Sequence, residues 1–572
     1  MAQLPEKSIS QCLGHDRVSE LVARISSTVQ QHLRSAASFS PDLSAPKQPP
    51  ACLHDRARVL QCIKRAVYFE RVHPRFPFLD RAAFEATAAA QGQPNTVPRS
   101  KSWTSLYYTV LALGSQYDGG GSFNPGSGES WELFSAALAN FTNLMLLPDS
   151  LTTLQALTAM TIYSMGMSSI GLDHIIISEA VRRAQNLAEA RFNNYATLAY
   201  RRTFWVLYGL EKVTSFNHGR SSGFSDCDIS CPIPSTPECY FGDFNWFVAF
   251  IRYARLLSRA YTSLFSVGVS DNADEYFLDI VDQLTEEIEA WRAALPDNGF
   301  RPGGSVKPTS LPVSSDMQEL ALIIHFFYNS FLQTISRMAL RHIPPSNQAR
   351  RQAMFERVEQ TAQSILELTS LIEVAPYTSM WMLIGIPMTS FFVLFDLVIH
   401  NPRQQQAASN LALLDIAAAH ASQLDYVSEG AIPGSVIGEF VHIVRTYVSE
   451  VNGLSVAGDT TQQPLPHTGQ VLFSQPHWSL PHDEIEEFAA MDVAADFSEM
   501  NLAVDSGPPG VGGPMDIEGL PMGPNTFMGT DVMNFFGYFM PDWEPLVYPG
   551  QTSQHDVPAS IYPDEHLDTT QP

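Results

Sequence analysis

Three cysteines and a histidine that lie close together in the chain are the residues best suited to chemistry. Cys227, Cys231 and Cys239 lie in the stretch HGRSSGFSDCDISCPIPSTPEC, which begins at His218. Thiolates and imidazole nitrogens are ligands that zinc prefers, so this group is a candidate zinc site. Structural zinc sites, however, present their thiolates in tight Cys-x-x-Cys pairs, and here prolines stiffen the longer intervals instead. We therefore predict no metal site, and we expect loop thiols that are free or partly buried.

Other catalytic patterns are also incomplete. The glycine-rich stretch at residues 119–130 lacks the Gly-Lys-Ser/Thr ending of a phosphate-binding loop. The stretch YSMGMSS does not match the Gly-x-Ser-x-Gly turn that exposes a nucleophilic serine. His73, His174 and His325 stand outside any His-Glu-x-x-His or His/Asp/Ser grouping, so we expect structural roles for them. The sequence therefore predicts no catalytic residue, no cofactor-binding residue and no enzyme.

The elements that carry these residues are predicted to be helices. From Cys52 to about Asn452 apolar residues recur at helical spacing, with almost no alternating runs of Val, Ile and Thr. The stretch DHIIISEAVRRAQNLAEARF has one apolar face, formed by Ile177, Val181, Ala184, Leu187 and Ala188. Its two arginines, Arg182 and Arg183, are expected to point to water. The pattern predicts an all-α fold with one large multi-helix domain.

Composition divides the chain into three regions. Residues 1–50 end in SFSPDLSAPKQPP, whose serines and prolines cannot close a core, so we expect a disordered lead. Residues 51–452 form the predicted helical domain. Residues 453–572 are rich in Pro, Gly and Gln and contain acidic and aromatic clusters, so we expect a disordered acidic tail.

One apolar segment resembles a membrane span in length. Residues 380–400 are about as long as the roughly 20 apolar residues that cross a bilayer. The segment contains Pro387 and Asp396, and an aspartate within the hydrocarbon core is costly. It also lacks basic residues before it. We therefore predict a buried pair of core helices, with an integral membrane protein as the alternative.

Charge is distributed very unevenly along the chain. The 34 Lys and Arg residues and 59 Asp and Glu residues give a formal net charge of −25. No Lys or Arg follows Arg445, whereas 19 acidic residues do, which leaves the preceding part with 34 basic and 40 acidic residues. A protein of this charge does not attract nucleic acid as a whole, so any DNA contact must be local.

The number and spacing of the cysteines and the N-terminal stretch indicate the cellular compartment of the protein. The six cysteines are few and irregularly spaced for 572 residues, which argues against a disulfide scaffold and for a reducing compartment. The N-terminal stretch MAQLPEKSISQCLGHDRV lacks the apolar core of a secretory signal. We therefore expect an intracellular protein.

Aromatic side chains among the acidic residues of the tail indicate partner binding. Acidic residues keep such a segment solvated, while the aromatic side chains stay available to a groove on another protein. The predicted contacts are Phe488, Phe497, Phe535, Phe536, Phe539 and Trp543. A tail that serves only solubility is the alternative, but exposed aromatic clusters such as FFGYFM would then only raise the risk of aggregation.

The stretch YFERVHPRFPFLDRAAFE combines aromatic residues with two prolines at fixed spacing. Its motif residues are Tyr68, Phe69, His73, Pro74, Pro77 and Phe84. A helix that buries the first aromatic side chains would end here, the prolines would force a corner, and Asp80 would cap a new helix that points Phe84 inward. This arrangement resembles the fungal-specific transcription factor domain, which is the middle homology region of fungal zinc-cluster regulators.

Two later blocks support the resemblance. Residues 151–191 are similar to a pair of helices of the family. Residues 200–234 resemble its most specific stretch through Arg201, Arg202, Phe204, Trp205, Gly219, Arg220, Asp226, Asp228 and Pro234. Departures from the family are Glu211 and Lys212, where Asp-Arg is common, and Ser221, where proline is usual. These changes keep charge or are local, so we expect the same fold.

The resemblance implies a transcription regulator in the nucleus that controls a metabolic or biosynthetic gene group. Its helical domain would mediate inhibition, effector response or dimer contact, and its tail would recruit transcription machinery or coactivators. Family members typically carry an N-terminal six-cysteine zinc cluster that binds DNA, and residues 1–50 contain only Cys12. The chain is thus expected to act through a homodimer or a zinc-cluster partner, or else an upstream exon encodes the cluster. A helical ligand-binding sensor or enzyme with a solubilising tail is the alternative from another class.

Overall fold

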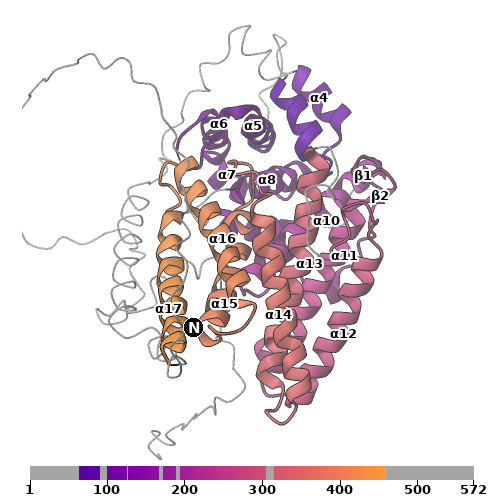
Figure 1. Ribbon diagram of the computed structural model, residues 1–572. Helices are drawn as coiled ribbons and strands as arrows, with labels where there is room; N and C mark the ends of the chain where they lie inside the picture. The colour runs from indigo at the N-terminus through magenta and orange to yellow at the C-terminus, as the bar shows by residue number, and fades with distance from the viewer. Residues whose placement is uncertain are drawn as a thin grey trace, which may run out of the picture. The chain divides into compact units, whose positions relative to one another are not determined.

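The computed structural model describes residues 63–90, 100–124, 126–166, 172–187, 194–303 and 315–458 (Figure 1). Within these ranges nearly all regular structure is helical, and the strand pair β1–β2 is the one small sheet. The prediction of an all-α fold is therefore confirmed. The predicted lead and tail, with the six aromatic contacts, lie outside the described residues, and the division into three regions stays a prediction.

The regular elements follow one another closely along the chain. The α-helices are α4 (Arg81–Ala89), α5 (Lys101–Ser115), α6 (Glu129–Leu138), α7 (Phe141–Leu146), α8 (Leu151–Ser164), α9 (Leu172–Asn186), α10 (Asn194–Asn217), α11 (Trp246–Ala260), α12 (Asp274–Ala293), α13 (Ser315–His342), α14 (Gln348–Thr369), α15 (Ile386–His400), α16 (Ala407–Val427) and α17 (Ile437–Gly458). Short π turns are η1 (Tyr68–Val72), η3 (Gln116–Gly120), η7 (Tyr261–Phe265) and η10 (Trp381–Gly385), and short 3-10 turns are η5 (Asp226–Asp228), η6 (Pro237–Cys239), η8 (Val267–Val269) and η11 (Gly434–Val436). Strands β1 (Tyr240–Phe241) and β2 (Phe244–Asn245) pair antiparallel.

Buried side chains form two hydrophobic clusters. The N-terminal cluster takes its side chains from residues 68–254, and in it α5 packs against α6 and α8. Phe134 on α6 stacks on Tyr163 of α8, with ring centroids 4.0 Å apart. The absence of a side chain at Gly114 lets the carbonyl of Lys64 approach α5, because a Cβ there would lie 2.0 Å from that oxygen.

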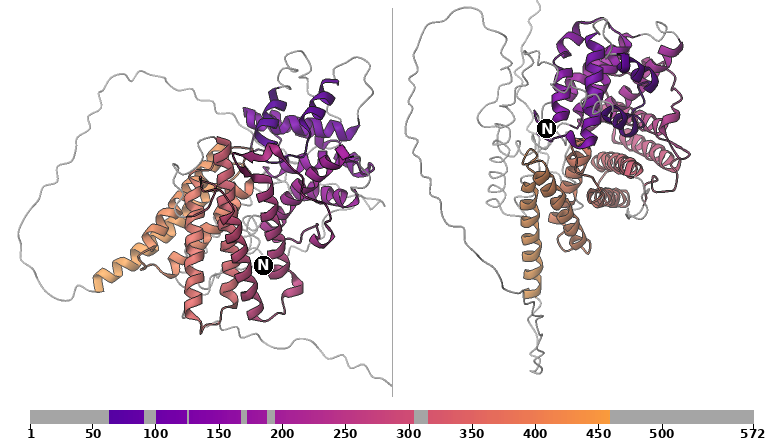
Figure 2. Two further views of the ribbon diagram at one scale, coloured as in Figure 1. Left: turned by 90° about the vertical axis from the view of Figure 1, so that its right-hand side faces the viewer. Right: turned by 90° about the horizontal axis from the view of Figure 1, so that it is seen from above.

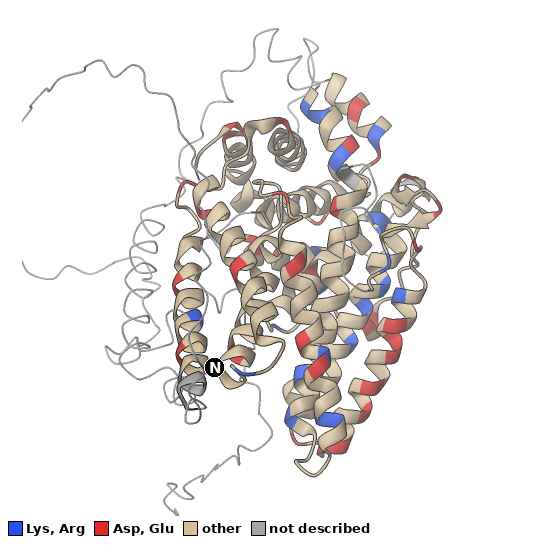
Figure 3. Ribbon diagram, viewed as in Figure 1, with Lys and Arg blue, Asp and Glu red and all other residues tan. Residues whose placement is uncertain are grey.

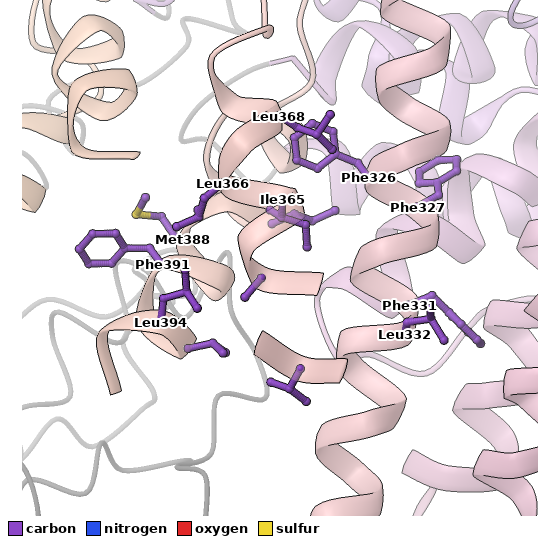
Figure 4. Close-up of a cluster of buried hydrophobic side chains, with 14 of the residues drawn as sticks. Phe326, Phe327, Phe331, Leu332, Ile365, Leu366, Leu368, Met388, Phe391 and Leu394 are labelled. Atoms are coloured by element: carbon purple, nitrogen blue, oxygen red, sulfur yellow. The ribbon is translucent and has the colours of Figure 1, made fainter. Parts of the chain in front are cut away.

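The C-terminal cluster takes most of its side chains from residues 213–448. Helices α13 and α14 pack along each other over much of their length, and α15 and α16 both pack against α14 (Figure 2). Figure 4 shows the contact between three of these helices. Its labelled side chains are Phe326, Phe327, Phe331 and Leu332 from α13, Ile365, Leu366 and Leu368 from α14, and Met388, Phe391 and Leu394 from α15. Removal of these side chains from water is the main source of the domain's stability.

The long apolar segment lies inside this cluster. Residues 381–400 are long and apolar enough to cross a membrane, but 94% of the apolar window is buried within the protein. The segment consists of turn η10 followed by α15, and Pro387 stands in the first turn of α15, where its missing N–H is not needed. Asp396 is fully buried and lies 3.2 Å from the ring of His400. These contacts support the prediction of core elements.

The prediction that Arg182 and Arg183 both point to water is wrong for Arg183. The Arg182 side chain is 51% exposed, whereas that of Arg183 is 1% exposed. The guanidinium of Arg183 donates to the carbonyl oxygens of Leu144, Met145 and Leu147 at 2.6–2.8 Å. The last carbonyls of a helix have no partner within it, so Arg183 satisfies the end of α7. Helical periodicity could not reveal this role, because α7 lies almost 40 residues earlier in the chain.

Candidate functional site

The first motif block forms the corner that its prolines predict. Tyr68, Phe69 and Phe84 are buried, and the rings of Phe69 and Phe84 meet edge to face at 5.7 Å. The side chain of Asp80 accepts a hydrogen bond from the backbone N–H of Ala83 at 2.7 Å, which caps α4. The helix before the corner ends in turn η1. Pro77 is buried, and Pro74 is half-buried.

The third motif block lies on α10 and fastens a loop to that helix. Arg202 donates to Glu238 at 2.5 Å and to the carbonyl of Ser235 at 3.2 Å. The indole N–H of Trp205 donates to the carbonyl of Pro232 at 3.0 Å. The same block contains three further motif residues. Of these, Phe204 and Pro234 are buried, and Arg201 is half-buried. The block therefore positions the loop at residues 232–238.

The remaining motif residues lie in the exposed loop after α10. Gly219 adopts φ = 59°, a conformation that favours glycine, and ends the helix. Arg220 and Asp228 are exposed. Asp226 accepts a hydrogen bond from the hydroxyl of Tyr208 at 2.9 Å and lies 3.3 Å from the ammonium group of Lys212. This loop is thus held to α10 at Asp226, and the functional roles of the motif residues stay predictions.

Two departures from the family pattern contribute to holding this loop. Glu211 accepts hydrogen bonds from the N–H of Gly223 at 2.8 Å and from the hydroxyl of Ser222 at 2.7 Å. Lys212 donates to the carbonyl of Phe224 at 2.8 Å. Both side chains are buried, so the Glu-Lys pair has a structural role in the described loop.

Glu238 joins the first and third motif blocks. Its carboxylate lies 3.6 Å from His73 of the corner and 2.5 Å from Arg202 of α10. Burial opposes ionisation of Glu238, but the nearby ring of His73 and the charge of Arg202 outweigh this effect, so the pKa of the carboxyl group lies below its ordinary value. The sequence gives no signal for Glu238, because nothing in the stretch STPEC distinguishes it from any surface glutamate.

Replacing Glu238 by glutamine is expected to lower the free energy of unfolding by about 1–3 kcal/mol at pH 7, because the ion pair with Arg202 is lost and the contact with His73 is weakened. The depressed pKa makes the carboxylate's contribution fully present above the ordinary pKa of about 4.5, and it is lost as the pH falls through the lower folded-state pKa. The difference between wild type and variant in urea unfolding should therefore shrink below pH 4.5. A difference that stays constant from pH 7 to pH 3 would contradict the assignment.

The cysteine group is spread over different environments. Cys227 is exposed, Cys231 is half-buried and Cys239 is buried. Burial raises the pKa of the Cys239 thiol to about 12, so this group stays protonated and is a poor metal ligand. In the described part of the chain, no three His, Cys, Asp or Glu side chains are grouped so that they could hold a metal ion.

A cavity of about 70 Å³ lies where the two hydrophobic clusters meet. Turn η1 contributes Val72 to the cavity wall, and the corner after it contributes Arg75 and Phe76. Arg75 makes two hydrogen bonds of 2.5 Å to Glu319 on α13, one to each carboxylate oxygen. The two side chains are 8% and 15% exposed, so this ion pair closes the cavity on one side and ties the two clusters together.

Seven of the 20 residues that line the cavity are aromatic. They are Phe76, Tyr117, Trp246, Phe250, Phe327, Tyr377 and Trp381. Several of their rings are nearly parallel: Trp246 and Phe250 are 5.2 Å apart at 19°, and Phe327 and Trp381 are 5.3 Å apart at 25°. Tyr377 stacks on Tyr117 at 4.1 Å. Such a wall offers flat apolar faces to a small molecule.

Gln116 and Tyr117 add polar groups to the cavity wall. Burial raises the pKa of Tyr117 to about 12 despite the opposing charge of Arg75, so the hydroxyl group stays neutral. Gln116 is 8% exposed, and its side-chain amide makes no hydrogen bond to any described residue. The sequence offered no signal for this cavity, because its wall comes from segments between residues 72 and 382.

Residues 66–293 match the sequence profile of the fungal specific transcription factor domain. This part of the chain therefore matches the domain, which confirms the resemblance drawn from its three motif blocks. The match begins just before the corner and ends with α12, so it contains both the Glu238 contacts and 13 of the 20 residues of the cavity wall.

Several named relatives are transcription factors. The chain is 23% identical over 419 residues to an ABC-transporter-regulating transcription factor of Aspergillus oryzae, which covers 67% of this chain and 46% of that protein. It is 23% identical over 433 residues to a protein of the same name in Aspergillus fumigatus, covering 69% and 48%. A fusaridione A cluster transcription factor of Fusarium heterosporum is 20% identical over 452 residues, covering 75% and 79%.

The chain spans about half the length of the two Aspergillus relatives. The relatives are transcription regulators, not enzymes, which agrees with the prediction that this chain is not an enzyme. Residues 1–62 lie outside the described residues, so the prediction about the zinc cluster is not tested.

Proposed function

We propose that the chain is a fungal transcription regulator that acts in the nucleus on a metabolic or biosynthetic gene group. The observation that carries this proposal is the domain match over residues 66–293, together with relatives that are named as transcription factors. One of these relatives is named for a biosynthetic cluster, which supports the kind of target. In this function the helical domain receives the regulatory signal, and the tail contacts transcription machinery or coactivators.

The charges of the domain favour indirect DNA contact. On the face shown in Figure 3, Lys and Arg are scattered among Asp and Glu instead of forming one basic stripe. Exposed ion pairs such as Arg259–Glu287, Arg350–Asp282 and Arg445–Asp415 follow the same pattern. DNA binding by phosphate contacts needs clustered positive charge. We therefore propose that DNA contact is supplied by a zinc-cluster partner, or by a second copy of this chain paired with such a partner.

Residues 446–572 fused to a foreign DNA-binding domain are expected to activate a reporter gene. Replacing Phe535, Phe536, Phe539 and Trp543 together by alanine is expected to lower reporter output at least about fivefold, because aromatic side chains supply most of the binding energy at such contacts. The measurement is reporter activity at equal fusion-protein abundance.

The aromatic variant is itself a sharp control, because it keeps all 19 acidic residues of the segment. If acidity alone gives activity, both fusions will activate equally. If neither fusion activates, the proposal that this tail recruits the transcription machinery fails. The same fusion made with residues 63–303 serves as a further control and is expected to be inactive.

A further inference from the structure

The cavity between the two clusters is larger than a packing defect. It measures about 70 Å³ and is largely enclosed but not sealed. A single water needs only roughly 10–15 Å³, and protein interiors normally fill larger spaces because each unfilled volume costs stability. An apolar cavity of roughly 150 Å³ accommodates benzene, so the space here holds only part of one ring, and the rest of the molecule would lie in the unsealed opening.

The shape of the wall selects a planar molecule. The ring of Phe327 lies 6.3 Å from that of Phe250 and 5.3 Å from that of Trp381, with interplanar angles of 15° and 25°. Tyr253 stacks on the same Phe327 at 4.3 Å and 7°, which fixes the orientation of the ring. A flat aromatic ring gains offset stacking on such faces, whereas a saturated ring of equal size does not.

The charges of the wall select a neutral molecule. The lining residues contain one cation and one anion, Arg75 and Glu319, and these already form two short hydrogen bonds to each other. A carboxylate ligand would compete with Glu319 for Arg75, and a cationic ligand would compete with Arg75 for Glu319. Either competition leaves a buried charge without its counter-ion, which is strongly unfavourable.

Gln116 supplies a hydrogen-bonding group for such a molecule. Its residue is 92% buried in the wall, and its amide has both a donor and an acceptor without a partner among the described residues. A ligand group that can both donate and accept would pair with both ends of this amide. An amide, a hydroxyl or a carbonyl group on the ring meets this need.

We propose that this cavity binds one small, neutral, planar aromatic molecule that carries an amide, hydroxyl or carbonyl group. Such a molecule would touch Leu113 and Leu210 of the N-terminal cluster and Trp246 and Phe327 of the C-terminal cluster at the same time. Binding would therefore favour one arrangement of the two clusters over others. A role of this binding in transcription regulation rests on the proposed function, whereas the binding itself does not depend on it.

Three nearly identical molecules test the proposal on the full-length chain. Benzamide, benzoate and benzamidine share one planar shape and are neutral, anionic and cationic at pH 7. We expect benzamide to bind with a dissociation constant about tenfold lower than either charged molecule, measured by ligand-observed NMR titration. Cyclohexanecarboxamide, which is not planar, is expected to bind about fivefold more weakly than benzamide. Equal affinities within the set, or no binding of benzamide at millimolar concentration, would overturn the proposal.

Two variants test the location. Gln116→Leu is expected to weaken benzamide binding at least about fivefold, and Gln352→Leu, which changes an exposed glutamine of α14, is expected to leave it unchanged. Ile162→Phe, which fills the cavity from α8, is expected to abolish binding and replaces the first variant if that one does not fold. Unchanged binding in a folded cavity variant overturns the assignment. These binding assays use no reporter gene. The proposal about the tail and the proposal about the ligand site can therefore be contradicted independently of each other.

Discussion

Replacing Arg183 by alanine is expected to lower the free energy of unfolding by about 3–5 kcal/mol, which is a large part of the stability of a typical domain. The variant leaves the carbonyl oxygens at the end of α7 without their donor. It also leaves Asp149 and Glu179, at 3.0 Å and 2.8 Å from the guanidinium, without their buried cation. The measurement is urea unfolding of the full-length chain followed by circular dichroism.

Arg182→Ala is the matched control for this prediction. Arg182 is the preceding residue and binds the same Glu179, but its side chain is 51% exposed. Exposed ion pairs contribute little, so the expected loss is below about 0.5 kcal/mol. Similar losses for the two variants would show that burial of Arg183 does not have the energetic weight assigned to it.

Removing one member of the Arg75–Glu319 pair is expected to lower the free energy of unfolding about as much as Arg183→Ala does. In Glu319→Ala the guanidinium of Arg75 stays buried without the carboxylate that receives both of its short hydrogen bonds. Breaking a buried pair in this way costs about 3–5 kcal/mol, because the desolvated charge is no longer compensated. The measurement is again the free energy of unfolding, and we also expect the contact between the two clusters to loosen.

The double variant Arg75→Met with Glu319→Leu separates charge from packing. Replacing both charges by apolar side chains of similar size should recover most of the loss, because no uncompensated charge remains. Glu287→Ala breaks the exposed pair with Arg259 and is expected to cost less than about 1 kcal/mol. If the double variant is as unstable as the single one, the pair contributes through shape and not through its charges.

Much of the local structure follows from patterns that a single segment contains. Prolines at 74 and 77 require a corner, Asp80 has the chemistry of a helix cap, and the apolar spacing of residues 176–187 requires one buried face. These effects act over a few residues, so they can be recognised without knowledge of the fold. The apolar segment at residues 380–400 could likewise be assigned to the core, because its aspartate and proline argue against a lipid environment.

Contacts between distant segments could not be recognised in the same way. Glu238 meets His73 across 165 positions of sequence, and Arg75 meets Glu319 across 244. The spacing of charged residues along the chain does not indicate which of them will be buried together, because burial depends on how the helices pack. Arg183 shows the consequence: the helical pattern placed it beside Arg182, and the neighbouring end of α7 decided that it is buried.

The amino-acid sequence by itself determined the helical class, the motif corner and the uneven charge along the chain, because these properties depend on local spacing and composition. Only the tertiary structure decided where the cavity lies, which ion pair closes it and that Gln116 faces it, because the wall is assembled from segments that meet only after the two clusters pack. The domain match then assigned the class of protein, which agrees with the motifs but does not follow from the cavity.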